Sequence, residues 1–388
     1  MLLIDRPYVS DFLIRTIQEE GFPVVATTEA KKLAGDLNLP WISERDALNQ
    51  LTEDPTTPLY TNSENALPWI SLNMHDSPLI EQLRICKDKI AFRELIKDSF
   101  PDFSFRTLDY PELENLDFED FKAPFVIKPS VGFFSLGVHI VRCKADLEAA
   151  SMELSRQRIK NLFPLQVLDA STFIIEEYVE GEEFAIDCYY NLEGKVVILN
   201  ILHHKFSSGT DTSDRVYITS RDLVMKYKEK FEDFLNITGD KAGFRNFPAH
   251  VEVRLDKQGT IVPIEINPLR FGGFCTTADL AGIALDLNLY SCYQKRLVPD
   301  WDVVFKDRSD KIFSIVVLNN NSGIPAERIS SFDYDLLARD FENPLEIRRM
   351  DFNKLPLFGF IFTETSPDNV GELDQILDSN LKKYIRTS

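Results

Sequence analysis

The feature that most constrains this chain is a pair of alternating segments close to residue 260. Apolar and polar side chains alternate over residues 250–256 and again over residues 264–267, the end of a predicted strand at 260–267. A period of two predicts strands with one apolar face and one polar face. A two-residue turn at 258–259 joins the strands into a hairpin and sets Glu252 directly opposite Glu265.

Three oxygen-bearing side chains share the polar face of this predicted hairpin: Glu252, Glu265 and Asn267. Two carboxylates that face each other repel unless a cation lies between them. Hard oxygen ligands, with room for water and phosphate, suit Mg²⁺. The alternative is a solvated polar face whose charge is balanced by Arg254.

Glycine usage excludes the commonest nucleotide sites. The chain has 16 glycines in 388 residues, and no two of them stand in a G-x-G arrangement. The dinucleotide fingerprint and the kinase-type glycine loop are therefore absent. Gly132 and Gly137 have the spacing of a Walker loop, but Val138 follows where that loop requires lysine. A nucleotide site in this chain has to be built from other residues.

Charge and cysteine usage narrow the partners and the compartment. The chain has 43 basic and 62 acidic residues, a formal net charge of −19. This acidity argues against nucleic acid or an anionic membrane as a partner, because both attract a basic surface. The five cysteines form no C-x-x-C pair, and no apolar run is long enough to span a membrane. These features predict a cytoplasmic protein.

The order of predicted elements indicates an α/β lobe followed by α+β structure. Strands at 2–4 and 23–26 flank a helix at 10–20, and residues 78–98 have the apolar spacing of one amphipathic helix. Beyond residue 103, antiparallel hairpins alternate with helices. The remaining predictions are strands at 124–129, 138–142, 172–178, 184–190, 195–202, 312–318 and 357–362, helices at 146–162, 221–235, 278–296 and 369–385, and a polar loop at 206–221.

Glu252, followed 13 residues later by Glu265-x-Asn267, resembles the magnesium-binding end of the ATP-grasp superfamily. Other parts of the chain resemble that family in the same order, over about residues 85–295. Asp88-Lys89 resembles the first phosphate-contacting lysine. Lys128, in Phe-Val-Ile-Lys-Pro-Ser-Val-Gly, resembles the strand lysine that precedes a phosphate-covering loop.

Residues 175–183, Ile-Glu-Glu-Tyr-Val-Glu-Gly-Glu-Glu, resemble the hinge that receives adenine and ribose in this family. The resemblance implies ATP and Mg²⁺ (or Mn²⁺) as cofactors. It implies that ATP is bound by Lys89, Lys128, Ser135, Glu176, Glu177, Val179 and Glu183, and that the metal is bound by Glu252, Glu265 and Asn267.

Three further residues are implied in catalysis: Arg270, His250 and Lys205. Arg270 follows the metal motif, where an arginine would steady phosphoryl or acyl-phosphate charge. It stands one position later than in the common Asn-Pro-Arg pattern. His250 stands two residues before Glu252, where related enzymes often carry arginine. Lys205 begins the polar loop, from which a residue in related ligases reaches the transferred phosphate.

The reaction implied by the resemblance is ATP-dependent ligation of a small-molecule carboxylate to an amine through an acyl phosphate, with amino acids as the expected substrates. One alternative is a carboxylase or carbamoyl-phosphate type of enzyme that activates bicarbonate. Another is an ATP-binding module without catalysis. A homodimer is the family expectation.

The fold implied is an ATP-grasp fold of the α+β and α/β classes, with four parts. They are an amino-terminal α/β domain at 1–100, ATP-grasp subdomains at 101–178 and 179–298, the second carrying the metal site, and a carboxyl-terminal α+β lobe at 299–388.

Overall fold

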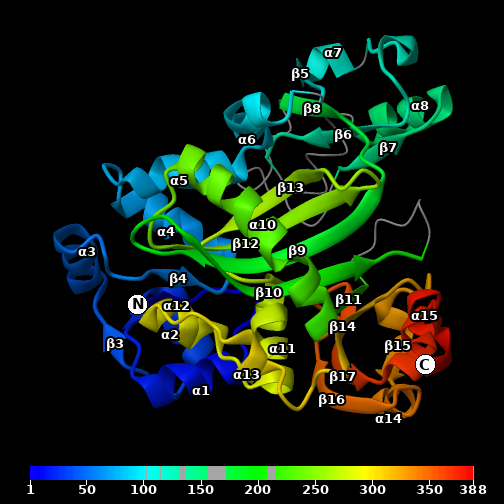
Figure 1. Ribbon diagram of the computed structural model, residues 1–388. Helices are drawn as coiled ribbons and strands as arrows, with labels where there is room; N and C mark the ends of the chain where they lie inside the picture. The colour runs from blue at the N-terminus through cyan, green and yellow to red at the C-terminus, as the bar shows by residue number, and fades with distance from the viewer. Residues whose placement is uncertain (102, 114, 132–136, 155–171, 208–214, 388) are drawn as a thin grey trace.

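The amino-terminal lobe of the computed structural model is a small parallel sheet covered by helices (Figure 1). The structure describes residues 1–387 except 102, 114, 132–136, 155–171 and 208–214. The strand order is β3 (Trp41–Ile42), β2 (Val24–Val25), β1 (Leu2–Leu3), β4 (Tyr60–Thr61). The helices of the lobe are α1 (Asp11–Glu20), α2 (Thr28–Ala34), α3 (Glu44–Glu53) and α4 (Leu67–Asn73). The predicted β-α-β opening is confirmed: Ser10 caps α1, and Gly21 ends it in the left-handed region with φ 67°.

A second, antiparallel sheet of four strands stands apart from the amino-terminal lobe, at the top of Figure 1. Its order is β5 (Phe105–Asp109), β8 (Thr172–Glu177), β6 (Phe125–Pro129), β7 (His139–Val141). One face packs with α7 (Tyr110–Leu113) and α8 (Lys144–Glu153) around a core of its own. The other face of β6 and β8 is thereby left to carry polar groups.

The largest sheet has eight antiparallel strands and runs through the middle of the molecule (Figure 1). Its strands in order are β13 (Ile261–Pro268), β12 (Phe247–Asp256), β9 (Gly181–Tyr190), β10 (Val196–Lys205), β11 (Val216–Ser220), β14 (Ile312–Asn319), β17 (Leu357–Thr365) and β16 (Asn343–Arg349). The helices α10 (Arg221–Ala242), α11 (Thr276–Leu285), α12 (Leu289–Lys295) and α13 (Trp301–Val304) follow its strands. The largest apolar core joins this sheet to the amino-terminal lobe.

The last part of the chain has a separate small core behind β14 and β17. Around it lie α14 (Tyr334–Ala338), α15 (Gly371–Leu377) and a two-stranded sheet of β15 (Ile329–Phe332) and β18 (Ile385–Thr387). Because β14, β17 and β16 continue the eight-stranded sheet, this part shares its backbone hydrogen bonding with the central strands.

The single helix predicted over residues 78–98 is wrong, because the structure breaks it at Asp88. It has α5 (Pro78–Lys87) and α6 (Lys89–Ile96) instead. Asp88 is extended, with φ −99° and ψ 106°, and its carboxylate accepts hydrogen bonds from the backbone N–H groups of Ile90 and Ala91. Aspartate competes for backbone donors in this way and favours caps over helix interiors. As a result Lys89 is the first residue of α6.

Three other predicted elements differ from the structure. The helix predicted at 278–296 is divided into α11 and α12, with Asp286 in the left-handed region at φ 53°. The last helix ends at Leu377 and is followed by β18. The polar loop at 206–221 contains β11, which pairs with both β10 and β14. The helix predicted at 146–162 is seen as α8 up to Glu153, and its last part lies outside the described residues.

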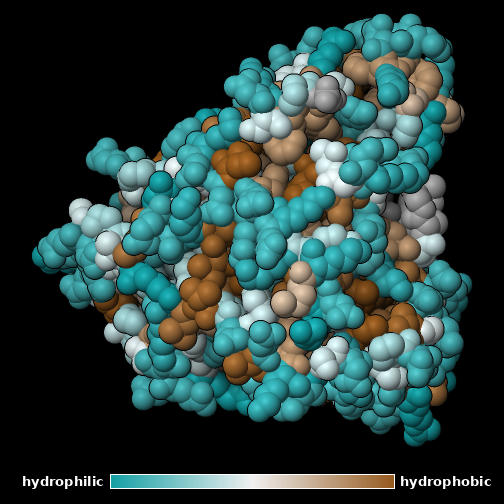
Figure 2. All heavy atoms as spheres, in the orientation of Figure 1, coloured by the Kyte–Doolittle hydropathy of each residue, from teal (hydrophilic) through white to brown (hydrophobic). Residues whose placement is uncertain are grey.

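The visible face of the molecule is covered mainly by hydrophilic residues, as the net charge of −19 leads one to expect (Figure 2). In the part of the chain that the structure describes, no helix is both long and apolar enough to cross a membrane.

Candidate active site

The predicted hairpin is present, and it sets Glu252 opposite Glu265 and His250 opposite Asn267. Near the turn the pairing is one residue out of the predicted register, with Leu255 opposite Ile261, and a bulge after Glu252 restores it. The Glu252 and Glu265 side chains are 31% and 21% exposed. The two carboxylates are therefore partly exposed on one face of β12 and β13. Asn267 belongs to the same face but is buried.

The residues of this face fit a magnesium site that is completed by a polyphosphate. The positive charge beside the carboxylates comes from Lys89, whose Nζ lies 3.9 Å from Glu265 Oε2. His250 Nε2 lies 3.7 Å from Glu252 Oε1. Within the described residues, no group of three or more His, Cys, Asp and Glu side chains could hold a metal ion. Two carboxylates and one amide leave positions for phosphate oxygens and water, which Mg²⁺ commonly keeps.

Arg270 reaches the face formed by Glu252, Glu265 and Asn267, termed the metal face for the site that it fits, although Arg270 stands one position late in the motif. The additional residue, Leu269, adopts φ 58° and is buried. Its N–H donates to Pro248 O at 2.8 Å, and its carbonyl accepts from Thr61 N at 2.7 Å. Arg270 then turns back, and its Nη2 donates to Asn267 Oδ1 at 2.8 Å. The left-handed residue thus absorbs the insertion.

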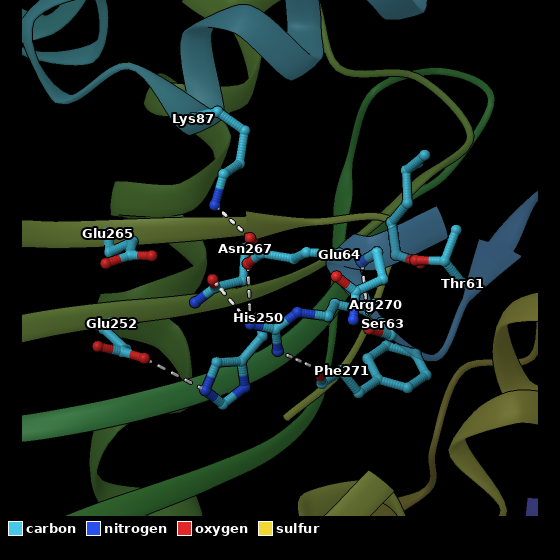
Figure 3. A network of polar contacts seen from close by, with 12 residues as sticks. Thr61, Ser63, Glu64, Lys87, His250, Glu252, Glu265, Asn267, Arg270 and Phe271 are labelled. Atoms are coloured by element: carbon cyan, nitrogen blue, oxygen red, sulfur yellow. Dashed lines mark hydrogen bonds and ion pairs between the residues drawn. The ribbon is translucent and has the colours of Figure 1, made fainter. Parts of the chain in front are cut away.

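Glu64, just after β4 in the amino-terminal lobe, belongs to the same cluster of charges and is not indicated by any sequence motif. Its carboxylate accepts a hydrogen bond from Arg270 Nη2 at 3.1 Å and from Lys87 Nζ (Figure 3). Burial raises the pKa of Glu64, but Lys87 and Arg270 outweigh it and hold that pKa at about 2. The missed signal is positional, because side chains after the carboxyl ends of parallel strands commonly bind ligands.

Lys128 of β6 lies in a buried charge cluster with Glu176 of β8. Its Nζ is 2.5 Å from Glu176 Oε2, and Arg93 Nε of α6 is 2.5 Å from Glu176 Oε1. Burial lowers the pKa of Lys128, and Glu176 partly offsets that effect. Burial raises the pKa of Glu176, but Arg93 and Lys128 outweigh it and hold that pKa at about 2. The Glu176 carboxylate is thus engaged by two cations, one of which, Arg93, the sequence analysis missed.

The predicted ribose contact, Glu183, is also engaged by protein groups. Arg254 Nε donates to Glu183 Oε2 at 2.8 Å, and His204 Nδ1 lies 3.1 Å from Glu183 Oε1. Burial raises the pKa of Glu183, but these two partners outweigh it and lower that pKa. Arg254 Nη1 also donates to Val179 O at 3.0 Å, which links the hairpin to the hinge formed by Glu177 to Val179.

His250 is held by a second buried carboxylate that the sequence analysis missed. Its Nδ1 lies 2.7 Å from Oδ1 of Asp187, which is opposite His250 in the register of β9 and β12. Asp187 is fully buried. This contact orients the imidazole so that Nε2 faces Glu252, 3.7 Å away.

Most of the candidate site residues lie in a range that matches a known protein family. Residues 121–278 match the family model described as ATP-grasp domain. These residues form an ATP-grasp domain. The matched range holds Lys128, the residues 175–183, and Glu252, Glu265 and Asn267. No curated protein sequence matches the chain.

Solved structures of ATP-grasp enzymes match along the whole chain. The L-amino acid ligase from Bacillus licheniformis is 19% identical with a TM-score of 0.66, and the match covers 100% of this chain and 98% of that one. The N5-carboxyaminoimidazole ribonucleotide synthetase from Thermotoga maritima is 15% identical with a TM-score of 0.64, over 99% and 98% of the chains. Biotin carboxylase from Campylobacter jejuni is 14% identical with a TM-score of 0.61, over 100% and 91%. At these identities the match shows the ATP-grasp fold.

One of the predicted site residues, Lys205, lies apart from the others. His204 shares the face of Glu183, so its neighbour Lys205 projects from the opposite face of the sheet. Lys205 Nζ lies 2.7 Å from Asp374 Oδ1 of α15. Ser135, predicted to cover the phosphates, lies outside the described residues.

Proposed function

We propose that this ATP-grasp enzyme activates a small-molecule carboxylate as an acyl phosphate and joins it to an amine, with amino acids as substrates. The observation that carries the proposal is the convergence of the metal face with Lys89 and Arg270. Lys89 lies 3.9 Å from Glu265, and Arg270 lies 2.8 Å from Asn267. Acidic and basic side chains thus converge at one place, where the phosphates of ATP and a substrate carboxylate would be bound next to each other.

The chemistry follows from what each group supplies. A carboxylate oxygen attacks the γ-phosphorus of ATP, the new C–O–P linkage forms and ADP leaves. The amine nitrogen then attacks the carbonyl carbon, the bond to phosphate breaks, and a C–N bond forms with loss of one proton. Bound Mg²⁺ would neutralise charge on the phosphate oxygens.

The protein contributes fixed charge and positioning, and its own side chains form no covalent intermediate. We assign Glu252, Glu265 and Asn267 to the metal, and Lys89 and Lys128 to the phosphates. Arg270 steadies the charge of the phosphoryl group and of the acyl phosphate. We assign adenine to the backbone of Glu177–Val179 and the ribose hydroxyls to Glu183. The side chain of Lys205, on the far face, has no role in this proposal.

His250 supports an amine ligase. In this chain a histidine oriented by Asp187 stands where a guanidinium is common in related enzymes, and its Nε2 faces the metal carboxylates. We propose that it contacts the substrate carboxylate or the incoming amine.

The proposed location of the protein is cytoplasmic, and its five free cysteines are consistent with that location. A homodimer remains the family expectation.

The decisive experiment measures ADP and phosphate release by the purified protein with Mg²⁺ and panels of amino acids and other carboxylates. We expect release only when a carboxylate and an amine are both present, and a product whose mass is their sum less one water. Release that needs bicarbonate alone would instead support the carboxylase alternative. Full release without any acceptor would contradict the ligase proposal.

The metal assignment is tested by Glu265→Gln, with Glu364→Gln as the matched control. Glu364 is a carboxylate of β17 in the same sheet, and its side chain is 28% exposed. We expect Glu265→Gln to lose about 10²-fold or more in Mg²⁺-dependent turnover, because the amide cannot supply a charged metal ligand. The control is expected to turn over normally. Full turnover by Glu265→Gln would overturn the assignment.

A further inference from the structure

We propose that Glu64 of the amino-terminal lobe is a positioning residue for Arg270, which it holds against the metal face. The inference rests on the proposed function, because the role of Arg270 in phosphoryl transfer belongs to that proposal. Glu64 lies outside the range matched by the family model, residues 121–278. It is therefore a contribution that the amino-terminal lobe makes to the reaction of the ATP-grasp core.

The position of Glu64 follows from the amino-terminal sheet. β4 ends at Thr61, and the short helix Glu64–Ala66 follows, with the Ser63 side chain accepting from Asn65 N. Asn62, between them, donates through Nδ2 to the carbonyls of Asp5 and Tyr8 at 2.7 Å. These hydrogen bonds hold the turn that presents Glu64 rigidly.

The same turn is attached to the loop that carries Arg270. Thr61 N donates to Leu269 O at 2.7 Å, one residue before Arg270. The rings of Tyr60 and Phe271 lie 5.2 Å apart, on the other side of Arg270. Arg270 is therefore flanked on both sides by contacts between its loop and the end of β4, and Glu64 adds the contact to its side chain (Figure 3).

The insertion of Leu269 explains why Arg270 needs such a partner. In the left-handed region Leu269 reverses the chain, so the arginine side chain has to fold back to reach Asn267. Its Nη1 donates to Phe271 O at 2.8 Å, and its Nη2 is shared between Asn267 and Glu64. A long guanidinium side chain has many rotamers, and a charged hydrogen bond selects among them.

Charge balance also supports this role. Glu64 has two cationic partners, Lys87 and Arg270, so the three side chains together keep one positive charge. The strongly lowered pKa of Glu64 shows that its anionic form is the one the site stabilises. A fixed anion therefore faces Arg270, and Arg270 itself carries the positive charge that an acyl phosphate requires.

The structural test does not depend on knowing the substrates. Crystal structures of the wild type and of Glu64→Gln, both with Mg·ADP, are compared at Arg270. We expect the wild type to keep the contact between Arg270 and Asn267 and the variant to lose it. An Arg270 that stays on Asn267 in Glu64→Gln would overturn the positioning role, whether or not the proposed function is correct.

The kinetic test uses the carboxylate and the amine identified by the release experiment. It separates the effect of Glu64 on Arg270 from its effect on Lys87. Glu64→Gln is expected to lower kcat by about 10²-fold, since a misplacement of about 1 Å has that effect, with KM for ATP nearly unchanged. Glu64→Asp, which keeps the charge, is expected to recover part of kcat. In an Arg270→Met background, Glu64→Gln is expected to add no further loss.

Two controls complete the kinetic test. Glu29→Gln removes a surface carboxylate of the same lobe that pairs with Lys32, and it is expected to change neither kcat nor KM. Lys87→Met leaves the pair of Glu64 and Arg270 intact and is expected to keep kcat within about threefold, since only a neighbouring charge is lost. A loss in Lys87→Met equal to that in Glu64→Gln would overturn the proposal, as would additive losses in the double variant. If no substrate pair is turned over by the wild type, the proposed function fails, and the crystal structures alone decide the positioning role.

Discussion

At the scale of single residues, the site is built from charges that are buried in pairs. Glu176 holds both Lys128 and Arg93 within 2.5 Å, and all three side chains are at most 6% exposed. A buried charge without a partner is very costly. Among the described residues, Nη1 and Nη2 of Arg93 are buried without a hydrogen-bond partner, so Arg93 depends on Glu176. The carboxylate is therefore the element of this cluster that the fold can least lose.

This asymmetry predicts unequal effects for two substitutions in the cluster. Glu176→Gln leaves two buried cations without an anion, and we expect it to lower the free energy of unfolding by about 3–5 kcal/mol. Lys128→Met leaves Glu176 paired with Arg93, so we expect a smaller loss of stability and a raised KM for ATP. Urea denaturation and ATP kinetics measure the two effects. Equal destabilisation by both variants would contradict this account.

At the scale of elements, the loop after β13 contains several residues with an unusual backbone conformation. Leu269, Phe274 and Cys275 all have positive φ, which is unusual for residues other than glycine. Such conformations persist only where surrounding contacts impose them, and they collect at functional sites. Here the contacts are the hydrogen bond from Thr61 to Leu269 and that from Gly272 N to Thr277 Oγ1 at 2.8 Å.

The two adjacent glycines of this loop allow a matched test of its geometry. A Cβ added to Gly272 would lie 2.4 Å from Thr277 Cγ2, whereas one added to Gly273 would have nothing within 4 Å. We expect Gly272→Ala to lower the free energy of unfolding by about 1–3 kcal/mol and to reduce kcat, because the loop has to shift. Gly273→Ala is expected to match the wild type in thermal unfolding and turnover. The reverse order of effects would show that Gly273, not Gly272, is the constrained position.

At the scale of the whole molecule, the candidate site draws its residues from separate parts of the chain. Glu64 comes from the amino-terminal lobe, Lys89 from α6, Lys128 from the small sheet, and the two proposed metal carboxylates from the large sheet. The buried ion pair of Asp279 and Arg348, at 2.6 Å, joins α11 to β16. Charged contacts between distant elements therefore hold the working arrangement together.

The paired carboxylates of Glu176 and Glu64 predict that the folded protein loses stability in acid. The pKa of Glu176 is about 2 in the folded protein, against an ordinary value of 4.5. Its contribution to stability is present above pH 4.5 and is lost as the pH falls toward 2, by up to about 3 kcal/mol. Glu64 changes in the same direction. Urea denaturation between pH 6 and pH 3 should show this loss, and Glu176→Gln should show a shallower dependence on pH. An unchanged slope in that variant would contradict the account.

The hairpin and its pair of carboxylates were predictable from the sequence. Alternation of apolar and polar residues is a local property, and it was enough to put Glu252 and Glu265 on the same face. Their direct opposition also depends on the bulge after Glu252. The strand that carries Lys128 and the capped helix after Ser10 were predictable for the same reason. The ATP-grasp family followed from the order of such local motifs.

The rest of the site depended on contacts between residues far apart in the chain. Glu64 meets Arg270 across 206 positions, and Arg93 meets Glu176 across 83. The left-handed turn of Leu269 depends on its contact with the end of β4, and the position of Lys205 on the other face of the sheet depends on the pairing of β10 with β11. No local pattern encodes such contacts, because they arise only when packed lobes bring their surfaces together. The sequence therefore contained the hairpin with its two carboxylates and its amide, whereas the partners that orient these side chains came from the packing of the lobes.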